Sequence, residues 1–352
     1  MKNYILIILG LLFSTLSYSQ PAVDKMIRQG VSLHDKGRYK EAIDCYKKAL
    51  ESNPSSMPAV YEMSLSYLQL KDYDNALKNS TRVINANYQP LLMDAYIVKS
   101  TALAQTNKLD LSIQLLNEAI DRCGDSYLLH FNLGLSYFNK LNNRLAIHHL
   151  RKAIEIDATH PSAFLLYAYA LNDSGKWVQS FYAFHFFLFL EPNTERSKEA
   201  FGEMIDLLTI KRTDESELLT EDGVDRENIY DGLQKIQPIN SDPEVMFHFF
   251  EEASKNIFFT LGHLQNDSQS GLLWYFFVPT YEEILGSGYF DVYCRYVSAA
   301  YFPQSLEWWN NNKDKVDNFI EWFEHGQGYD DNDSYEGEEI IDGDDGLLED
   351  DE

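Results

Sequence analysis

Residues 30–54 read GVSLHDKGRYKEAIDCYKKALESNP, and this stretch decides the fold because its small residues recur along the chain. Gly30, Ala42 and Ala49 are separated by 12 and 7 residues. The same two spacings return in four further sets, namely Ser64, Ala76 and Val83; Ser100, Ser112 and Ala119; Gly134, Ala146 and Ala153; and Ala168, Ser180 and Phe187. Successive sets begin 34 residues apart, except for 36 between the second and third, which predicts a two-residue insertion near Asn87 to Leu92. A period of this length is typical of a repeat protein.

Two antiparallel helices joined by a tight turn explain these spacings. Such helices need small residues where their backbones come closest, one on the first helix and one on the second. A third small residue lets the second helix meet the next repeat. A larger side chain at these positions would overpack the contact, at a cost of about 1–3 kcal/mol. Gly37 suits the turn, and Pro54 and Pro192 stop the second helix of their repeats.

The stretch Gly30-Val-Ser-Leu33, Gly37-Arg-Tyr39-Lys-Glu-Ala42, Tyr46, Ala49 and Pro54 resembles the tetratricopeptide repeat family. The copies fall at residues 23–56, 57–90, 93–126, 127–160 and 161–194. The second and fourth are good matches, whereas the third has Leu109 where Tyr39 stands and the fifth has Phe187 at a small position. The resemblance implies an all-α fold, a right-handed solenoid of about five helix-turn-helix repeats.

The resemblance also implies that the first helix of each repeat lines a concave groove. Its positions here are Ile27, Val31, His34, Asp35, Tyr61, Leu65, Leu68, Gln69, Ile97, Thr101, Gln105, Phe131, Leu135, Phe138, Asn139, Leu165, Tyr169 and Asn172. Family members that hold the terminal carboxylate of cytosolic chaperones use Lys, Arg and Asn there, and this set has no Lys or Arg. We therefore expect a protein or peptide ligand with apolar anchors. The alternative is that some of these side chains belong to the core.

The second helix of the fifth copy includes Phe184 to Leu190 and is apolar on all sides, so it should be buried on all sides. At the end of a solenoid one side would face solvent, so the chain that follows is expected to cover it. Helical periodicity continues over 199–208, 245–261, 268–285, with a bend or break at Pro279, and 289–301. We predict a helical domain over residues 195–325 that caps the solenoid. Its aromatic residues are read as core, with a second binding surface as the alternative.

Residues 326–352 contain 13 acidic residues and neither Lys nor Arg, half of the net charge of −26. This acidic tail is predicted to be disordered. The overall charge disfavours nucleic acid and anionic membrane surfaces as partners, because phosphate binding needs a basic face.

Residues 1–19 are interpreted as a signal peptide. Lys2 gives a positive start, Ile5 to Phe13 is an apolar run too short to span a bilayer, and Ser17 and Ser19 suit a cleavage site. We expect an exported protein of the periplasm or cell envelope, with no transmembrane segment in the mature chain. An uncleaved anchor is the alternative.

The sequence offers little chemistry. Nine His residues lack metal-binding spacing, no phosphate loop or nucleophile elbow is present, and neither a cofactor nor a metal is expected. Cys45, Cys123 and Cys294 are too scattered for a disulfide scaffold, and the first two are not expected to be bridged. A binding scaffold is favoured over an enzyme. Two alternatives stay open: a site of converging ionisable groups near Glu282, Glu283, Asp291 and Arg295, and diffuse cation binding by the tail.

Overall fold

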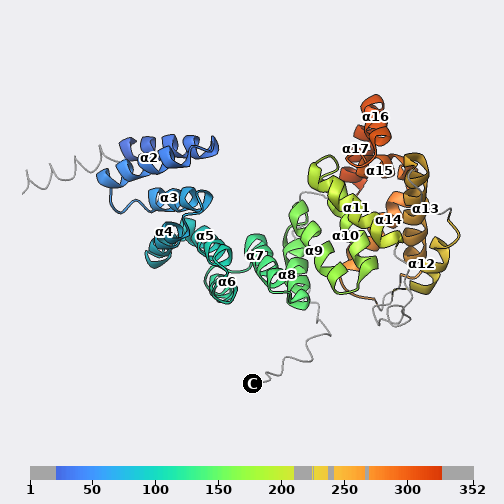
Figure 1. Ribbon diagram of the computed structural model, residues 1–352, viewed down its shortest axis with the longest axis horizontal. Coiled ribbons are helices and arrows are strands. Elements are labelled where there is room, and N and C mark those ends of the chain that lie inside the picture. Colours follow the sequence, from blue (N-terminus) through green and yellow to red (C-terminus); the bar gives the residue numbers. More distant parts are fainter. Residues whose placement is uncertain (1–20, 210–223, 225, 237–241, 266–268, 327–352) are drawn as a thin grey trace, which may run out of the picture.

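The computed structural model describes residues 21–209, 224, 226–236, 242–265 and 269–326, and this part of the chain is helical without a strand. The proposed signal peptide and the acidic tail lie outside the described residues. Five helix pairs come first and a group of further helices follows them (Figure 1).

The helix pairs are antiparallel and stack in chain order. They are residues 21–35 with α2 (Tyr39–Ser52), α3 (Met57–Gln69) with α4 (Tyr73–Asn85), α5 (Leu92–Gln105) with α6 (Leu109–Cys123), α7 (Tyr127–Asn139) with α8 (Asn143–Ile156), and α9 (Pro161–Asp173) with α10 (Trp177–Leu190). The 3₁₀ helix η1 (Gln89–Leu91) lies between α4 and α5, which is where the longer interval predicts two additional residues.

The small residues stand at close approaches between helices. A Cβ atom added to Gly134 would lie 2.6 Å from Cγ of Leu150, and one added to Gly30 would lie 2.3 Å from Cε1 of Tyr46. Such distances leave no room for a methyl group at Gly30 and Gly134 as their neighbours stand. The fifth copy departs from this rule, since Phe187 is fully buried at its small position.

The turns inside the pairs repeat the same period. One residue in each turn has a positive φ, namely Gly37 at 72°, Lys71 at 59°, Asn107 at 58°, Leu141 at 59° and Gly175 at 73°. The left-handed conformation suits glycine and strains most other residues. The intervals of 34, 36, 34 and 34 residues reproduce those of the small residues.

The remaining helices are α11 (Glu195–Thr209), α12 (Arg226–Leu233), α13 (Pro243–Gly262), the π-helix η3 (Leu273–Phe277), α14 (Val278–Gly286), α15 (Phe290–Val297), α16 (Pro303–Asn311) and α17 (Lys313–Gly326). The expected bend at Pro279 takes a different form. Pro279 lies in the first turn of α14, where a missing N–H is tolerated, and the irregular backbone precedes it in η3.

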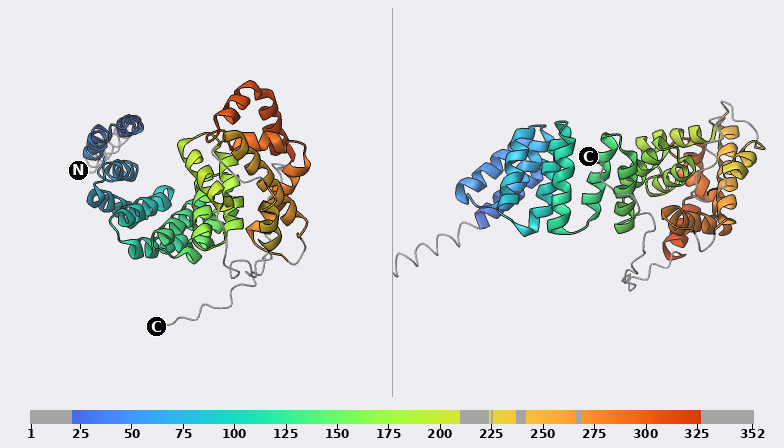
Figure 2. Two further views of the ribbon diagram at one scale, coloured as in Figure 1. Left: turned by 45° about the vertical axis from the view of Figure 1, so that its right-hand side comes forward. Right: turned by 90° about the horizontal axis from the view of Figure 1, so that it is seen from below.

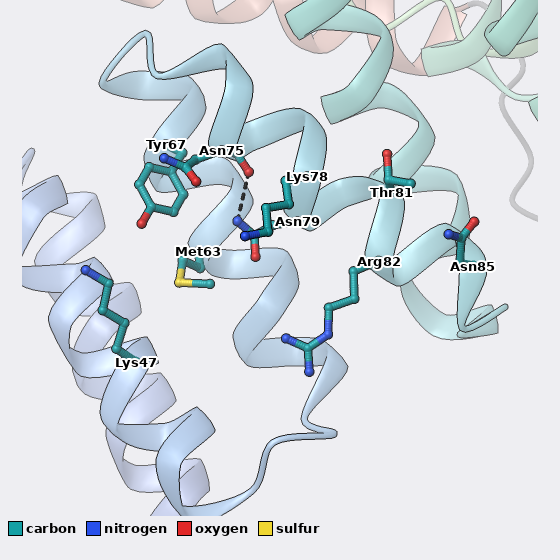
Figure 3. A pocket seen from close by; sticks show the side chains of 9 residues that line it. All are labelled: Lys47, Met63, Tyr67, Asn75, Lys78, Asn79, Thr81, Arg82 and Asn85. Carbon is teal, nitrogen blue, oxygen red and sulfur yellow. Dashed lines mark hydrogen bonds between the residues drawn. The ribbon is translucent and has the colours of Figure 1, made fainter.

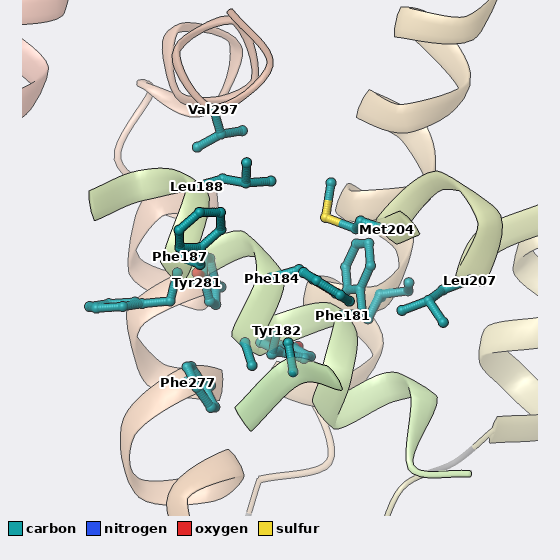
Figure 4. Packing of buried hydrophobic residues seen from close by; sticks show 14 of the residues in the cluster. Phe181, Tyr182, Phe184, Phe187, Leu188, Met204, Leu207, Phe277, Tyr281 and Val297 are labelled. Carbon is teal, nitrogen blue, oxygen red and sulfur yellow. The ribbon is translucent and has the colours of Figure 1, made fainter. Parts of the chain in front are cut away.

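Helix α10 is the centre of the largest hydrophobic core. Every residue from Trp177 to Leu188 is buried, and the helix contacts α9, α11, α15 and η3. Figure 4 shows Phe181 and Phe184 beside Met204 and Leu207 of α11. This core extends from Ala146 to Phe319 without a break. The prediction that following helices cover this apolar helix is therefore confirmed.

Candidate functional site: the inner face of the solenoid

The repeats follow an arc, and the first helix of each pair lies on its inner side (Figures 1 and 2). Contacts agree with this arrangement, because α3 contacts α5, α5 contacts α7, and α7 contacts α9. Helices α2, α4, α6 and α8 lie on the outer side (Figure 1). The groove positions expected from the sequence are thus on helices of the inner face.

None of the 18 groove positions is fully buried. Five are exposed, namely Asp35, Gln69, Gln105, Leu135 and Asn139, and thirteen are half-buried, namely Ile27, Val31, His34, Tyr61, Leu65, Leu68, Ile97, Thr101, Phe131, Phe138, Leu165, Tyr169 and Asn172. Half-burial is what a side chain shows when its base packs into a wall and its end meets solvent.

At the amino-terminal end of the inner face, the His34 ring is part of the wall. Its Nδ1 atom lies 2.8 Å from Oγ of Ser66 on α3, and its ring meets Tyr39 edge-on at 5.0 Å. The contact to Ser66 joins the first repeat to the second.

Carboxylates surround Tyr61 on α3. Burial raises the pKa of the Tyr61 hydroxyl above its usual value, and the charges of Asp94 and Glu62 raise it further. Burial likewise raises the pKa of the Glu62 carboxyl, with a further contribution from Asp35, and it raises the pKa of Asp94. This end of the face is therefore half-buried and weakly anionic.

Helix α7 gives the inner face its most apolar section. Leu128 is 41% exposed and Leu135 36%, and they lie on the same helix side as Phe131 and Phe138. The Phe131 ring stacks on that of Tyr127 with centroids 5.8 Å apart. Leu128 is not among the groove positions expected from the sequence, although its spacing of three and seven residues from Phe131 and Leu135 is the signal that could have identified it.

The carboxy-terminal end of the face adjoins α11. The Tyr169 ring packs edge-on against Phe184 at 5.3 Å. Burial raises the pKa of its hydroxyl, with smaller contributions from Glu203 and Glu199 of α11. The carboxylates of α11 are thus near enough to act electrostatically on the inner side of the fifth repeat.

Charge is sorted between the two faces. The five inner helices, residues 21–35 and α3, α5, α7 and α9, carry eight charged residues, of which three are basic. The five outer helices, α2, α4, α6, α8 and α10, carry 17, nine of them basic. An inner face with so few basic residues favours an apolar ligand over a carboxylate-bearing one, because few groups on these helices would neutralise the carboxylates.

The outer face has a shallow depression between α2 and α4 (Figure 3). It has a volume of about 520 Å³, with Met63 and Tyr67 of α3 among its lining residues. Lys47 of α2 and Lys78 and Arg82 of α4 also line it, together with Thr81 and three Asn side chains, and none of the lining residues is acidic.

His185 is the centre of a closed hydrogen-bond network inside the protein. His185 is fully buried, with Nδ1 2.5 Å from the Tyr293 hydroxyl and Nε2 3.3 Å from Oγ of Ser254. Burial lowers the pKa of His185 to about 3. A serine beside a histidine suggests nucleophilic catalysis, but all three side chains have 0% exposure, so no substrate reaches them.

A contact between two histidines, His130 and His149, links α7 to α8. His130 Nε2 lies 3.0 Å from Oδ1 of Asp125, and its Nδ1 lies 3.0 Å from Nδ1 of His149. Burial lowers the pKa of His149 to about 3, and the charges of His148 and His130 add to this effect. His149 is therefore neutral at physiological pH, and the pair holds two helices together.

The carboxylates of the alternative enzyme site lie on the surface. Glu282, Glu283 and Asp291 are exposed, and the Arg295 guanidinium lies over the rings of Phe247 at 4.8 Å and Trp308 at 5.4 Å. Among the described residues, no group of three or more His, Cys, Asp and Glu side chains is placed to hold a metal ion. Cys45, Cys123 and Cys294 are free thiols, and burial raises the pKa of Cys294.

No helix in the described part of the chain combines the length and the apolar character that a bilayer crossing requires.

The stacked helix pairs define an α-helical repeat protein. Three family models of the tetratricopeptide repeat match the chain, over residues 26–56, 61–127 and 128–160. The three matches end at residue 160, so the fifth pair is assigned from its helices and its turn.

The BBSome complex member BBS4 of Bos taurus is 24% identical over 155 residues, which are 44% of this chain and 29% of that protein. The chain thus spans less than a third of this relative. Two solved structures are also similar to the present chain. One is a thermophilic tetratricopeptide repeat protein of Thermus thermophilus, which is 21% identical and has a TM-score of 0.44. The match covers 53% of this chain and 100% of that chain. The other is PilF of Pseudomonas aeruginosa, with 18% identity, 54% and 85% coverage and a TM-score of 0.47.

Proposed function

We propose that this protein is an exported scaffold that holds a partner protein through an apolar segment bound on the inner face of its repeats. Tetratricopeptide repeats generally mediate protein–protein interaction. The observation that carries the proposal is the inner face itself, which has half-buried aromatic and aliphatic side chains and a single basic residue on α3, α5, α7 and α9.

The apolar strip on α7 is the expected anchor site. Leu128 and Leu135 are exposed there, with no covering element among the described residues, beside the half-buried rings of Phe131 and Phe138. Burying a leucine side chain contributes about 1.5–3 kcal/mol, so a few such contacts account for useful affinity. A binding role is favoured over catalysis because the Ser254–His185–Tyr293 network is sealed from solvent.

Export is part of the proposal and rests on the sequence of residues 1–19. Its support is the order of a basic start, a short apolar run and small residues at the expected cleavage site. Mass spectrometry of the mature protein from its source cells would test it, with Gln20 as the expected first residue.

Capture of partners from the envelope fraction tests the inner face. In one variant, Leu128 and Leu135 are changed to Glu. In the matched control, Leu111 and Ile156 of the outer helices, which are 52% and 47% exposed, are changed to Glu. We expect the inner variant to lose the captured partner and the control to retain it, because charges on α7 oppose an apolar ligand. Equal recovery with both variants would remove the inner face as the binding site.

A further inference from the structure

The depression between α2 and α4 is a basic site on a strongly acidic protein. The whole chain has a net charge of −26, yet Lys47, Lys78 and Arg82 line one depression whose lining residues include no carboxylate (Figure 3). Lys78 and Arg82 are four residues apart on α4 and so lie on the same side of the helix.

The geometry keeps these cations in place and available. Arg82 donates to the carbonyl oxygen of Pro54, which fixes the guanidinium beside the loop after α2. Lys47 has one ion pair, with Asp44 at 3.8 Å on its own helix, and both side chains are more than half exposed. Exposed pairs of this kind are weak, so a multivalent anion can displace Asp44.

The rest of the lining suits an extended peptide that is rich in carboxylates. Asn79 donates to the carbonyl of Asn75, and Asn85 and Thr81 of α4 add polar groups to the lining. Met63 and Tyr67 provide apolar surface for aliphatic side chains. The depression thus combines cations, hydrogen-bonding groups and a small apolar area.

Residues 327–352 of the chain have the complementary composition. They contain 13 acidic residues, neither Lys nor Arg, and two apolar pairs, Ile340-Ile341 and Leu347-Leu348. Opposite charge at this density steers two surfaces together and gives an association that weakens with salt.

A second copy is the favoured source of the acidic segment. Helix α17, which precedes the segment, and helices α2 to α4 lie at opposite ends of the molecule (Figure 1). A random coil of 26 residues, which is the length of segment 327–352, spans roughly 28 Å on average, about the width of three packed helices. Six helices, α5 to α10, and the C-terminal helices lie between the two sites.

We propose that the acidic segment 327–352 of one copy binds the basic depression of another, so that the protein associates head to tail. The contact is heterologous, because the two surfaces that meet are different. Repetition of such a contact produces rings or open chains rather than a closed two-fold dimer.

Sedimentation velocity of the full chain at rising concentration and low salt tests the proposal. We expect concentration-dependent association that high salt abolishes. The double variant Lys47→Glu, Lys78→Glu should weaken association roughly tenfold or more, because it places like charges against the segment. The matched control Lys40→Glu, Lys48→Glu makes the same charge change on exposed positions outside the depression and should associate like the parent.

A mixing experiment identifies the head-to-tail contact. A chain that ends at Gly326 keeps the depression and lacks the segment, whereas the Lys47→Glu, Lys78→Glu variant keeps the segment and lacks the basic site. Each alone should sediment as a monomer, and their mixture should form a one-to-one dimer that does not grow. A parent chain that is monomeric throughout, an equal loss in the control, or a mixture that stays monomeric would each overturn the proposal. Circular dichroism verifies that each variant is folded.

Discussion

At the scale of single residues, the glycines of the repeats give the sharpest prediction. Changing Gly134 to Ala would place a methyl group 2.6 Å from Leu150 Cγ, so the free energy of unfolding should fall by about 1–3 kcal/mol. The control is Gly202→Ala on α11, whose added Cβ would meet Tyr301 at an ordinary 3.6 Å. It should be neutral or stabilising by up to about 1 kcal/mol, because alanine favours a helix. Urea unfolding measures both, and equal effects would contradict the steric explanation.

The buried histidine predicts a pH dependence at the same scale. His185 has a pKa of about 3 in the folded protein against an ordinary value of 6.5. Between pH 6.5 and pH 3 the unfolded chain therefore binds a proton at this residue, whereas the folded chain does not. Stability is therefore fully present above pH 6.5 and falls as the pH drops toward 3. The loss from this group between pH 6 and pH 5 is about 1 kcal/mol. The variant His185→Gln should be less stable but show a flatter dependence in this interval, and an unchanged slope would contradict the assignment.

At the scale of elements, the sequence predicted the repeats well and the C-terminal helices less well. Small residues at fixed spacing identify helix pairs because the steric demand is local, and η1 lies where the longer interval predicts two additional residues. Lys71, Asn107 and Leu141 were not recognised as left-handed turn residues, because their side chains give no such signal. Their position in the period, aligned with Gly37 and Gly175, is the information that would have revealed it.

The candidate site was also predicted only in part. The inner positions follow from the repeat phase, so the helix and the face of each residue could be predicted. Which of these side chains pack into the wall and which stay open to solvent could not. His34 bonds to Ser66 of the next repeat, and sequence spacing alone does not distinguish that from an open groove position. The C-terminal helices were found as amphipathic stretches, yet their packing around α10 depends on contacts between distant residues, such as His185 with Tyr293.

At the scale of the whole molecule, stability should be uneven along the chain. The amino-terminal repeats contain small separate clusters, such as Ala42, Ile43, Tyr46 and Met63, whereas one continuous core extends from Ala146 to Phe319. In a repeat array each unit is stabilised by its neighbours, so an end with little buried surface opens most readily. Native-state hydrogen exchange should therefore be fastest in residues 21–52 and slowest in α10. Uniform protection along the described chain would show that the protein unfolds as one cooperative unit.

Helix α10 has a consequence for how this protein can change over generations. The first four helix pairs meet their neighbours through similar surfaces, so duplication or deletion of one 34-residue unit among them leaves matching partners behind. The fifth pair cannot be exchanged in this way, since α10 is also the centre around which α11, α15 and η3 are built. Lineages of this protein should therefore vary in the number of early repeats, while the fifth repeat and the aromatic helices after it are inherited together as one unit.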